Sequence, residues 1–177
     1  NYPTTDRTML IIKTVLEWPG NREEIMGLLD AILDKATSVD GLSGEKGLAG
    51  YSTIAPRAMA ELLEQFARIE PDFLKAIYDR HPSLHAMYRF HIETMCLDAY
   101  YPQIGDSGGF GQRCVSYAGA TFSKNPGAGP SAFTFFRRLY ELTRDPAFAQ
   151  IIYRENGDSV ADLPHDLFAD APAAFQK

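Results

Sequence analysis

Apolar residues recur every three or four positions along most of the chain, which is the period of helices that bury one face. The clearest stripe consists of Ile25, Leu28, Leu29, Ile32 and Leu33. Runs that alternate between apolar and polar residues around a two-residue glycine turn, the pattern of a β-hairpin, are nearly absent. The pattern therefore predicts an all-α fold of antiparallel helix hairpins.

Residues that favour helix ends divide this pattern into about seven helices. We expect helices that begin near Thr5, Asn21, Thr53, Pro71, Ser83, Pro130 and Asp145. Trp18-Pro19-Gly20 ends the first helix, and Asn21 with Glu24 three positions later forms a predicted capping box for the second. The helical pattern covers residues 1–155, and the Asp-, Ala- and Pro-rich residues 156–177 are interpreted as a linker or wrapping segment.

Composition narrows the class of protein. The 177 residues are 45% hydrophobic and 23% charged, as in an ordinary globular domain. The net charge of −6 argues against a non-specific nucleic-acid binder, and no apolar run is long enough to predict a membrane span. Two cysteines, Cys96 and Cys114, are too few for a disulfide framework, and their apolar neighbours indicate buried free thiols.

Two glycine-rich segments interrupt the helices. Residues 38–52 carry four glycines at a spacing of three, and residues 100–112 carry four more. Both are longer than the connections that usually join helices in a bundle. Long loops on a rigid scaffold are common positions for binding and catalytic residues, so these two loops are the first candidates for a functional site.

Several alternative sites fail on their context. The residues from Gly105 to Gly109 match the nucleophile motif of chymotrypsin-like serine proteases, but the chain lacks the strands for that fold. His81, His85 and His91 lie within eleven residues, yet Pro82 places His81 before a helix and no His-Glu-x-x-His pattern occurs. We expect His91 to pack in the core, and we expect neither a metal site nor a cofactor.

The two loops resemble a known family. The first loop contains Asp40-Gly41-Leu42-Ser43-Gly44-Glu45, followed by Gly50-Tyr51-Ser52 and a long helix. This segment resembles the catalytic-tyrosine segment of the heparinase II/III-like polysaccharide lyases. The second loop contains Tyr101-Pro102-Gln103-Ile104-Gly105-Asp106-Ser107-Gly108, and it resembles a second loop of the same family. The order and spacing of the helices agree with this resemblance across about residues 1–155.

This resemblance implies a fold, a compartment and a further domain. The helices would form part of an incomplete (α/α) toroid, so residues 1–155 would be a fragment of a larger helical domain. The family's toroid is followed by β-sandwich domains that contribute another catalytic histidine, and we expect such a domain in the same protein. A periplasmic or secreted location is implied in the same way.

The resemblance also implies an activity, that of a carbon–oxygen lyase acting on an acidic polysaccharide by β-elimination. Tyr51 is the candidate general base and acid. Asn1 takes the place of the amide that neutralises the uronate carboxylate, whereas Tyr2 departs from the family's histidine and is kept as a substrate-binding candidate.

Further candidate residues complete this interpretation. Glu45 would orient a neighbour or a sugar hydroxyl, Asp106 would hold the second loop through an Asx-turn or contact the sugar, and Arg113 would meet a carboxylate. Ser52 and Thr53 are expected to cap the helix that follows Tyr51. The charge of −6 favours a polyuronate over a densely sulfated chain.

Two other interpretations stay open. The chain could be a non-catalytic helical module that binds carbohydrate or protein, or a scaffold fragment of a larger enzyme. The surroundings of Tyr51 distinguish a lyase from a binding module, because a lyase needs an exposed phenol beside a group that neutralises a carboxylate.

Overall fold

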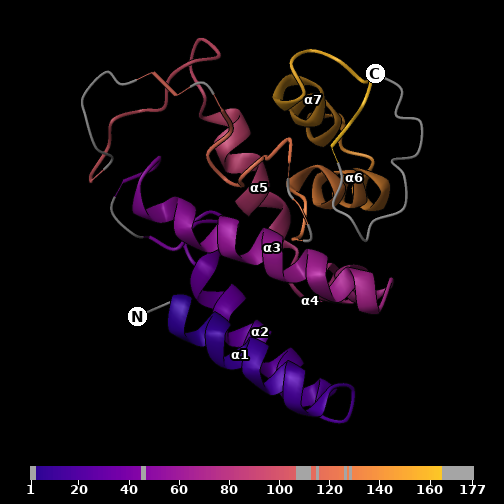
Figure 1. Cartoon of the computed structure of the whole chain (residues 1–177). Coiled ribbons are helices and arrows are strands. Elements are labelled where there is room, and N and C mark those ends of the chain that lie inside the picture. The colour runs from indigo at the N-terminus through magenta and orange to yellow at the C-terminus, as the bar shows by residue number, and fades with distance from the viewer. Residues whose placement is uncertain are drawn as a thin grey trace.

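The computed structural model describes residues 3–44, 47–106, 113–114, 116–125, 127 and 129–164. These residues form seven α-helices, one short 3₁₀ turn and no β-strand, which confirms the all-α prediction (Figure 1). In chain order the elements are α1 (Thr4–Glu17), α2 (Arg22–Ala36), η1 (Tyr51–Thr53), α3 (Ile54–Ile69), α4 (Phe73–Arg80), α5 (Ser83–Glu93), α6 (Ala132–Thr143) and α7 (Pro146–Glu155).

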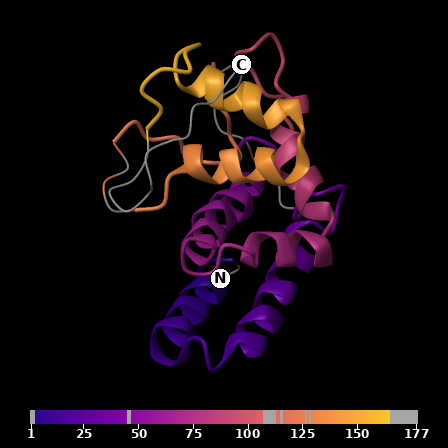
Figure 2. The same ribbon diagram turned by 90° about the vertical axis from the view of Figure 1, so that its right-hand side faces the viewer.

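Consecutive helices form hairpins around the long central helix α3. The α1–α2 pair and the α6–α7 pair lie at opposite ends of the molecule, and α3 lies between them (Figure 2). α3 packs against α1, α4 and α6, so it contacts both ends of the fold. Its buried residues include Met59, Leu63 and Phe66, whose spacings of four and three place them on one face of the helix.

The core combines aliphatic side chains of α2 and α3 with an aromatic cluster near α5, α6 and α7. Phe136 is fully buried and packs against several rings, those of Tyr88, Tyr117, Phe122, Phe135 and Phe148. A charged pair lies beside this cluster: the Glu64 carboxylate is fully buried on α3 and accepts a hydrogen bond from Arg138 Nε of α6 at 3.1 Å. This pair joins the central helix to the C-terminal hairpin.

Side chains at two helix starts behave differently from each other. Asp145 accepts a hydrogen bond from the backbone N–H of Ala147 at 2.9 Å and caps α7, which begins where a helix start was predicted. The capping box predicted at Asn21 is wrong, because the Asn21 amide donates to the Lys13 carbonyl oxygen at 3.0 Å instead. Glu24 pairs with Lys13 Nζ at 2.6 Å, so both residues hold α2 against α1.

The two cysteines are free thiols, as predicted. Cys96, however, is exposed and Cys114 is only half-buried, so the expectation that both are buried is wrong. Both lie in the irregular chain between α5 and α6 rather than on a helix stripe. In the described part of the chain, no helix has the length and apolar character needed to cross a membrane.

The chain beyond α7 turns back onto the helices as far as it is described. The Asn156 side chain donates to the Ser159 and Ala161 carbonyl oxygens, each at 2.9 Å. Leu163 is 8% exposed and joins the hydrophobic core. Asn156 and Leu163 therefore anchor this segment to the helical body, whereas most of the residues between them are exposed.

We predict that Gly41→Ala lowers the free energy of unfolding by about 3 kcal/mol. Gly41 has φ +91°, and a Cβ there would lie 2.8 Å from backbone atoms of Ala86 and Met87 in α5. Gly127→Ala is the matched control, because Gly127 has φ +64° but no described atom lies within 4 Å of its Cβ position. The control should lose only about 1 kcal/mol. Equal losses in urea titrations of the two variants would contradict close packing of the first loop on α5.

Candidate functional site

The two glycine-rich loops meet. The backbone N–H of Leu48, in the first loop, donates to the carbonyl oxygen of Ile104, in the second, at 3.3 Å. This contact joins segments 56 positions apart in the sequence, and it places the turn before Tyr51 beside the segment that leads to Asp106. The structure therefore brings together the two segments that carry the resemblance.

Helix α5 holds both loops through one buried histidine. His91 Nε2 donates to the Leu48 carbonyl oxygen at 2.8 Å, and the Tyr101 hydroxyl donates to the His91 carbonyl oxygen at 2.8 Å. His91 is fully buried and Tyr101 is 3% exposed. The backbone N–H of Ala118 donates to the Tyr101 hydroxyl at 3.1 Å, so the chain that leaves the second loop is fixed to the same point.

Burial sets the protonation of both side chains. Burial lowers the pKa of His91 to about 4, and the positive charge of Arg57 lowers it slightly further. The hydrogen bond to the Leu48 carbonyl oxygen acts in the opposite direction and raises the pKa, but by less than burial lowers it. Burial raises the pKa of Tyr101 to about 12. At neutral pH, His91 is therefore a neutral donor and Tyr101 keeps its proton. The prediction that His91 packs in the core is confirmed.

Buried hydroxyls fix the turn that precedes Tyr51. Ser52 Oγ is within hydrogen-bond distance of the Gly47 and Leu48 carbonyl oxygens, at 2.9 and 2.8 Å, and Thr53 Oγ1 donates to the Gly50 carbonyl oxygen at 2.8 Å. Neither side chain caps α3, so that prediction is wrong. Both hydroxyls instead bind the carbonyl oxygens of the turn, which fixes the backbone on both sides of Tyr51.

Tyr51 itself lies at the surface. Its side chain is 53% exposed, and it begins the 3₁₀ turn that continues into α3. The start of a long helix carries partial positive charge, which favours negative charge nearby. The phenol is therefore accessible to a large ligand while its backbone is held rigidly.

Two further candidate residues from the sequence lie in or beside the second loop. Asp106, within the second loop, and Arg113, directly after it, are both exposed. The backbone N–H of Cys114 donates to the Ala99 carbonyl oxygen at 2.7 Å, which fixes Arg113 near the base of that loop. No ion pair joins Arg113 to Asp106 in the described part of the chain. Asn1, Tyr2 and Glu45 lie outside the described residues, as do residues 107–112, which would complete an Asx-turn at Asp106.

The three histidines do not converge on a metal. Among the described residues, no group of three or more His, Cys, Asp or Glu side chains is arranged to hold an ion. His81 Nε2 lies 2.7 Å from Asp30, and His85 Nε2 lies 2.9 Å from Asp145. His81 and His85 therefore belong to two different contacts between helices, and His91 binds the two loops.

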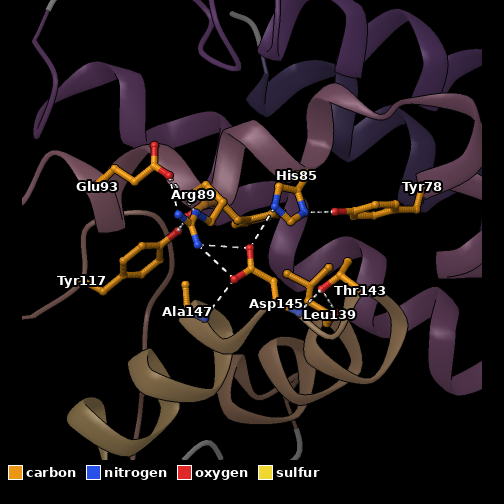
Figure 3. A network of polar contacts seen from close by, with 10 residues as sticks. Tyr78, His85, Arg89, Glu93, Tyr117, Leu139, Thr143, Asp145 and Ala147 are labelled. Carbon is orange, nitrogen blue, oxygen red and sulfur yellow. Dashed lines mark hydrogen bonds and ion pairs between the residues drawn. The ribbon is translucent and has the colours of Figure 1, made fainter.

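Sequence reasoning missed one polar network (Figure 3). Asp145 lies between His85 and Arg89 of α5, and Arg89 Nη1 is 2.9 Å from its carboxylate. His85 Nδ1 also contacts the Tyr78 hydroxyl, and Arg89 pairs with Glu93 at 2.5 Å. Burial, with a smaller effect of the Asp145 charge, raises the pKa of Tyr78 well above its usual range, so its phenol stays protonated. The network joins α4 and α5 to the turn between α6 and α7. In the sequence, it could have been suggested only by the spacing of four between His85, Arg89 and Glu93, which places these side chains on one face of a helix.

No protein-family model, no curated protein and no solved structure matches this chain.

We predict that the free energy of unfolding falls as the pH falls from 6.5 to about 4, by roughly 3 kcal/mol from His91 alone. In this range the unfolded imidazole binds a proton that the buried imidazole does not. The contribution of His91 to the free energy of unfolding is therefore fully present above pH 6.5 and is lost progressively as the pH falls towards 4. His91→Gln keeps a donor for the Leu48 carbonyl oxygen but does not titrate. The difference in unfolding free energy between the wild type and His91→Gln should shrink as the pH falls; a difference that is constant with pH would contradict this assignment.

Proposed function

We propose that this chain is the helical part of a polysaccharide lyase that cleaves a uronate-containing polysaccharide by β-elimination. One observation supports the proposal: Tyr51, an exposed phenol, lies three residues after Leu48, whose backbone N–H joins the first glycine-rich loop to the second. A helical scaffold presents both loops on one surface, and the loops have the sequence features that resemble the heparinase II/III-like lyases. An acidic polysaccharide is the proposed partner.

The reaction requires two proton transfers and one neutralised carboxylate. A base removes the proton at C5 of the uronate, the electron pair forms the C4–C5 double bond, and the C4–O bond breaks. An acid then gives a proton to the departing oxygen. One phenol can perform both transfers in turn on the same face of the sugar, and we assign both to Tyr51.

The carboxylate at C5 must be stabilised while the C5 proton leaves, because negative charge develops beside it. Arg113 is exposed at the end of the second loop and has no ion-pair partner in the described part of the chain, so it is a suitable group for this role. Asn1 is proposed as the neutralising amide, with Arg113 assisting it, and Tyr2, Glu45 and Asp106 are proposed to contact neighbouring sugar hydroxyls. The mechanism uses only side chains and involves no cofactor.

The larger context follows from the same resemblance. We propose that the hairpins belong to an incomplete (α/α) toroid, that a β-sandwich domain of the same protein completes the site, and that the protein acts in the periplasm or outside the cell. The all-α architecture supports this arrangement only at the level of fold class.

We predict that Tyr51→Phe lowers kcat on a cleaved polyuronate by about a hundredfold or more, because the phenol supplies both proton transfers. The assay follows the ultraviolet absorbance of the unsaturated uronate product over a panel of polyuronates. Tyr100→Phe is the matched control, since Tyr100 is a second exposed loop tyrosine, 39% exposed, and should retain wild-type activity. Unchanged activity of Tyr51→Phe would remove this residue from the mechanism. Binding of a polyuronate without any cleavage would favour the non-catalytic module.

A further inference from the structure

A second polar pocket, of about 210 Å³, lies between α3, the segment that precedes α6 and the first turn of α6. It is separate from the loop junction around Leu48 and Ile104. Its lining includes Arg57, Glu61, Thr121, Ser123, Asn125 and Ser131.

The wall formed by α6 offers hydrogen-bond donors. The first N–H groups of a helix have no partner within the helix, and the Ser131 side chain does not cap them. Ser131 is 2% exposed, and its buried hydroxyl has no hydrogen-bond partner among the described residues. A buried hydroxyl without a partner is costly, so a ligand that hydrogen-bonds Ser131 from the adjoining pocket would remove that cost. The start of the twelve-residue helix adds partial positive charge at the same place.

The opposite wall carries a guanidinium. Arg57 Nε donates to the Ala118 carbonyl oxygen at 2.8 Å, which fixes the side chain against the segment before α6. No described carboxylate forms an ion pair with Arg57. Glu61, the acidic residue in the lining, is paired with Arg7 at 2.7 Å, so its charge is already compensated. The pocket therefore has an excess of positive charge in a chain whose net charge is −6.

We propose that this pocket binds one anionic group, a carboxylate or a sulfate ester, of an acidic sugar. Arg57 supplies the charge-assisted hydrogen bonds, and Ser131 with the first N–H groups of α6 completes the anion site. Thr121, Ser123 and Asn125 provide hydroxyl and amide groups that can both donate to and accept from sugar hydroxyls.

The pocket and Tyr51 lie on the same side of η1 and α3. Tyr51, Ile54, Arg57 and Glu61 follow one another at spacings of three, three and four, which places them along one side of η1 and α3. Arg57 lies six positions after Tyr51, which corresponds to about 9 Å along the helix axis. A short oligosaccharide can span this distance. The assignment of the pocket as a subsite of the same polysaccharide rests on the proposed function, whereas binding of the anion does not.

Amide chemical shifts of the ¹⁵N-labelled chain test the anion site directly. The probes are sodium glucuronate, sodium sulfate and neutral glucose, at an ionic strength held constant with sodium chloride. Saturable shifts of the Ala132, Phe133 and Thr134 amides are expected with both anions and not with glucose. Tighter binding of glucuronate would identify a uronate carboxylate as the natural group, and tighter binding of sulfate would identify a sulfate ester.

Three variants test whether the anion binds at Arg57 and Ser131 rather than elsewhere on the surface. Arg57→Gln should weaken anion binding about tenfold, because one charge-assisted pair is lost. Ser131→Ala should weaken it severalfold without lowering thermal stability, since the hydroxyl makes no described contact within the fold. Lys75→Gln removes a positive charge from an exposed helix position, where the side chain is 60% exposed, and should bind anions as the wild type does. Absence of saturable shifts, or equal affinities of Arg57→Gln and Lys75→Gln, would overturn the anion site.

Cleavage kinetics separate this proposal from the lyase assignment. Tyr51→Phe should bind sulfate normally and lose cleavage, whereas Arg57→Gln should raise KM about tenfold and leave kcat nearly unchanged. Cleavage with an unchanged KM in Arg57→Gln would overturn the subsite and leave the role of Tyr51 intact. Anion binding at α6 without cleavage of any polyuronate would overturn the lyase assignment and leave the anion site intact.

Discussion

The two glycine-rich loops have few side chains to bury, so their placement depends on hydrogen bonds to α5. His91 provides the central one: its imidazole donates to Leu48, and its carbonyl oxygen accepts the hydroxyl of Tyr101. Because His91 is fully buried, loss of either contact would leave a polar group without a partner, at a cost of about 1–3 kcal/mol. The contact between Leu48 and Ile104, and with it the surroundings of Tyr51, follows from this anchoring.

Helix α3 relates the loop junction to the rest of the fold. Tyr51 begins the turn at its start, Arg57 lines the second pocket one to two turns later, and Glu64 is buried further along in a pair with Arg138. The pair with Arg138, in the middle of α6, holds that helix against α3, and the proposed anion site lies at the start of the same helix. A rigid helix that carries both the exposed phenol and the guanidinium would fix the spacing between the two places where a sugar chain is proposed to bind.

The helices could be predicted from the sequence because their apolar positions repeat at the helical period. The start of α7 could be predicted because the residues that favour it, Asp145 and Pro146, are adjacent in the sequence. Predictions failed where a short polar side chain had competing partners. Asn21 binds a carbonyl oxygen of α1, and Ser52 binds the turn before it rather than the helix after it. The contact between Leu48 and Ile104, and the pocket that unites Arg57 with Ser131, join residues far apart in sequence, and no local pattern indicates them.

The central claim is that a phenol held at the junction of the two loops removes a proton from an acidic sugar. Mass spectrometry of the products from a defined uronate oligosaccharide tests it most directly, because elimination adds no water whereas hydrolysis adds one molecule. The account predicts two fragments whose masses sum to that of the substrate, one of them with an unsaturated end, and no such fragments from Tyr51→Phe. Fragments whose masses sum to substrate plus one water, or unsaturated fragments formed equally well by Tyr51→Phe, would contradict it.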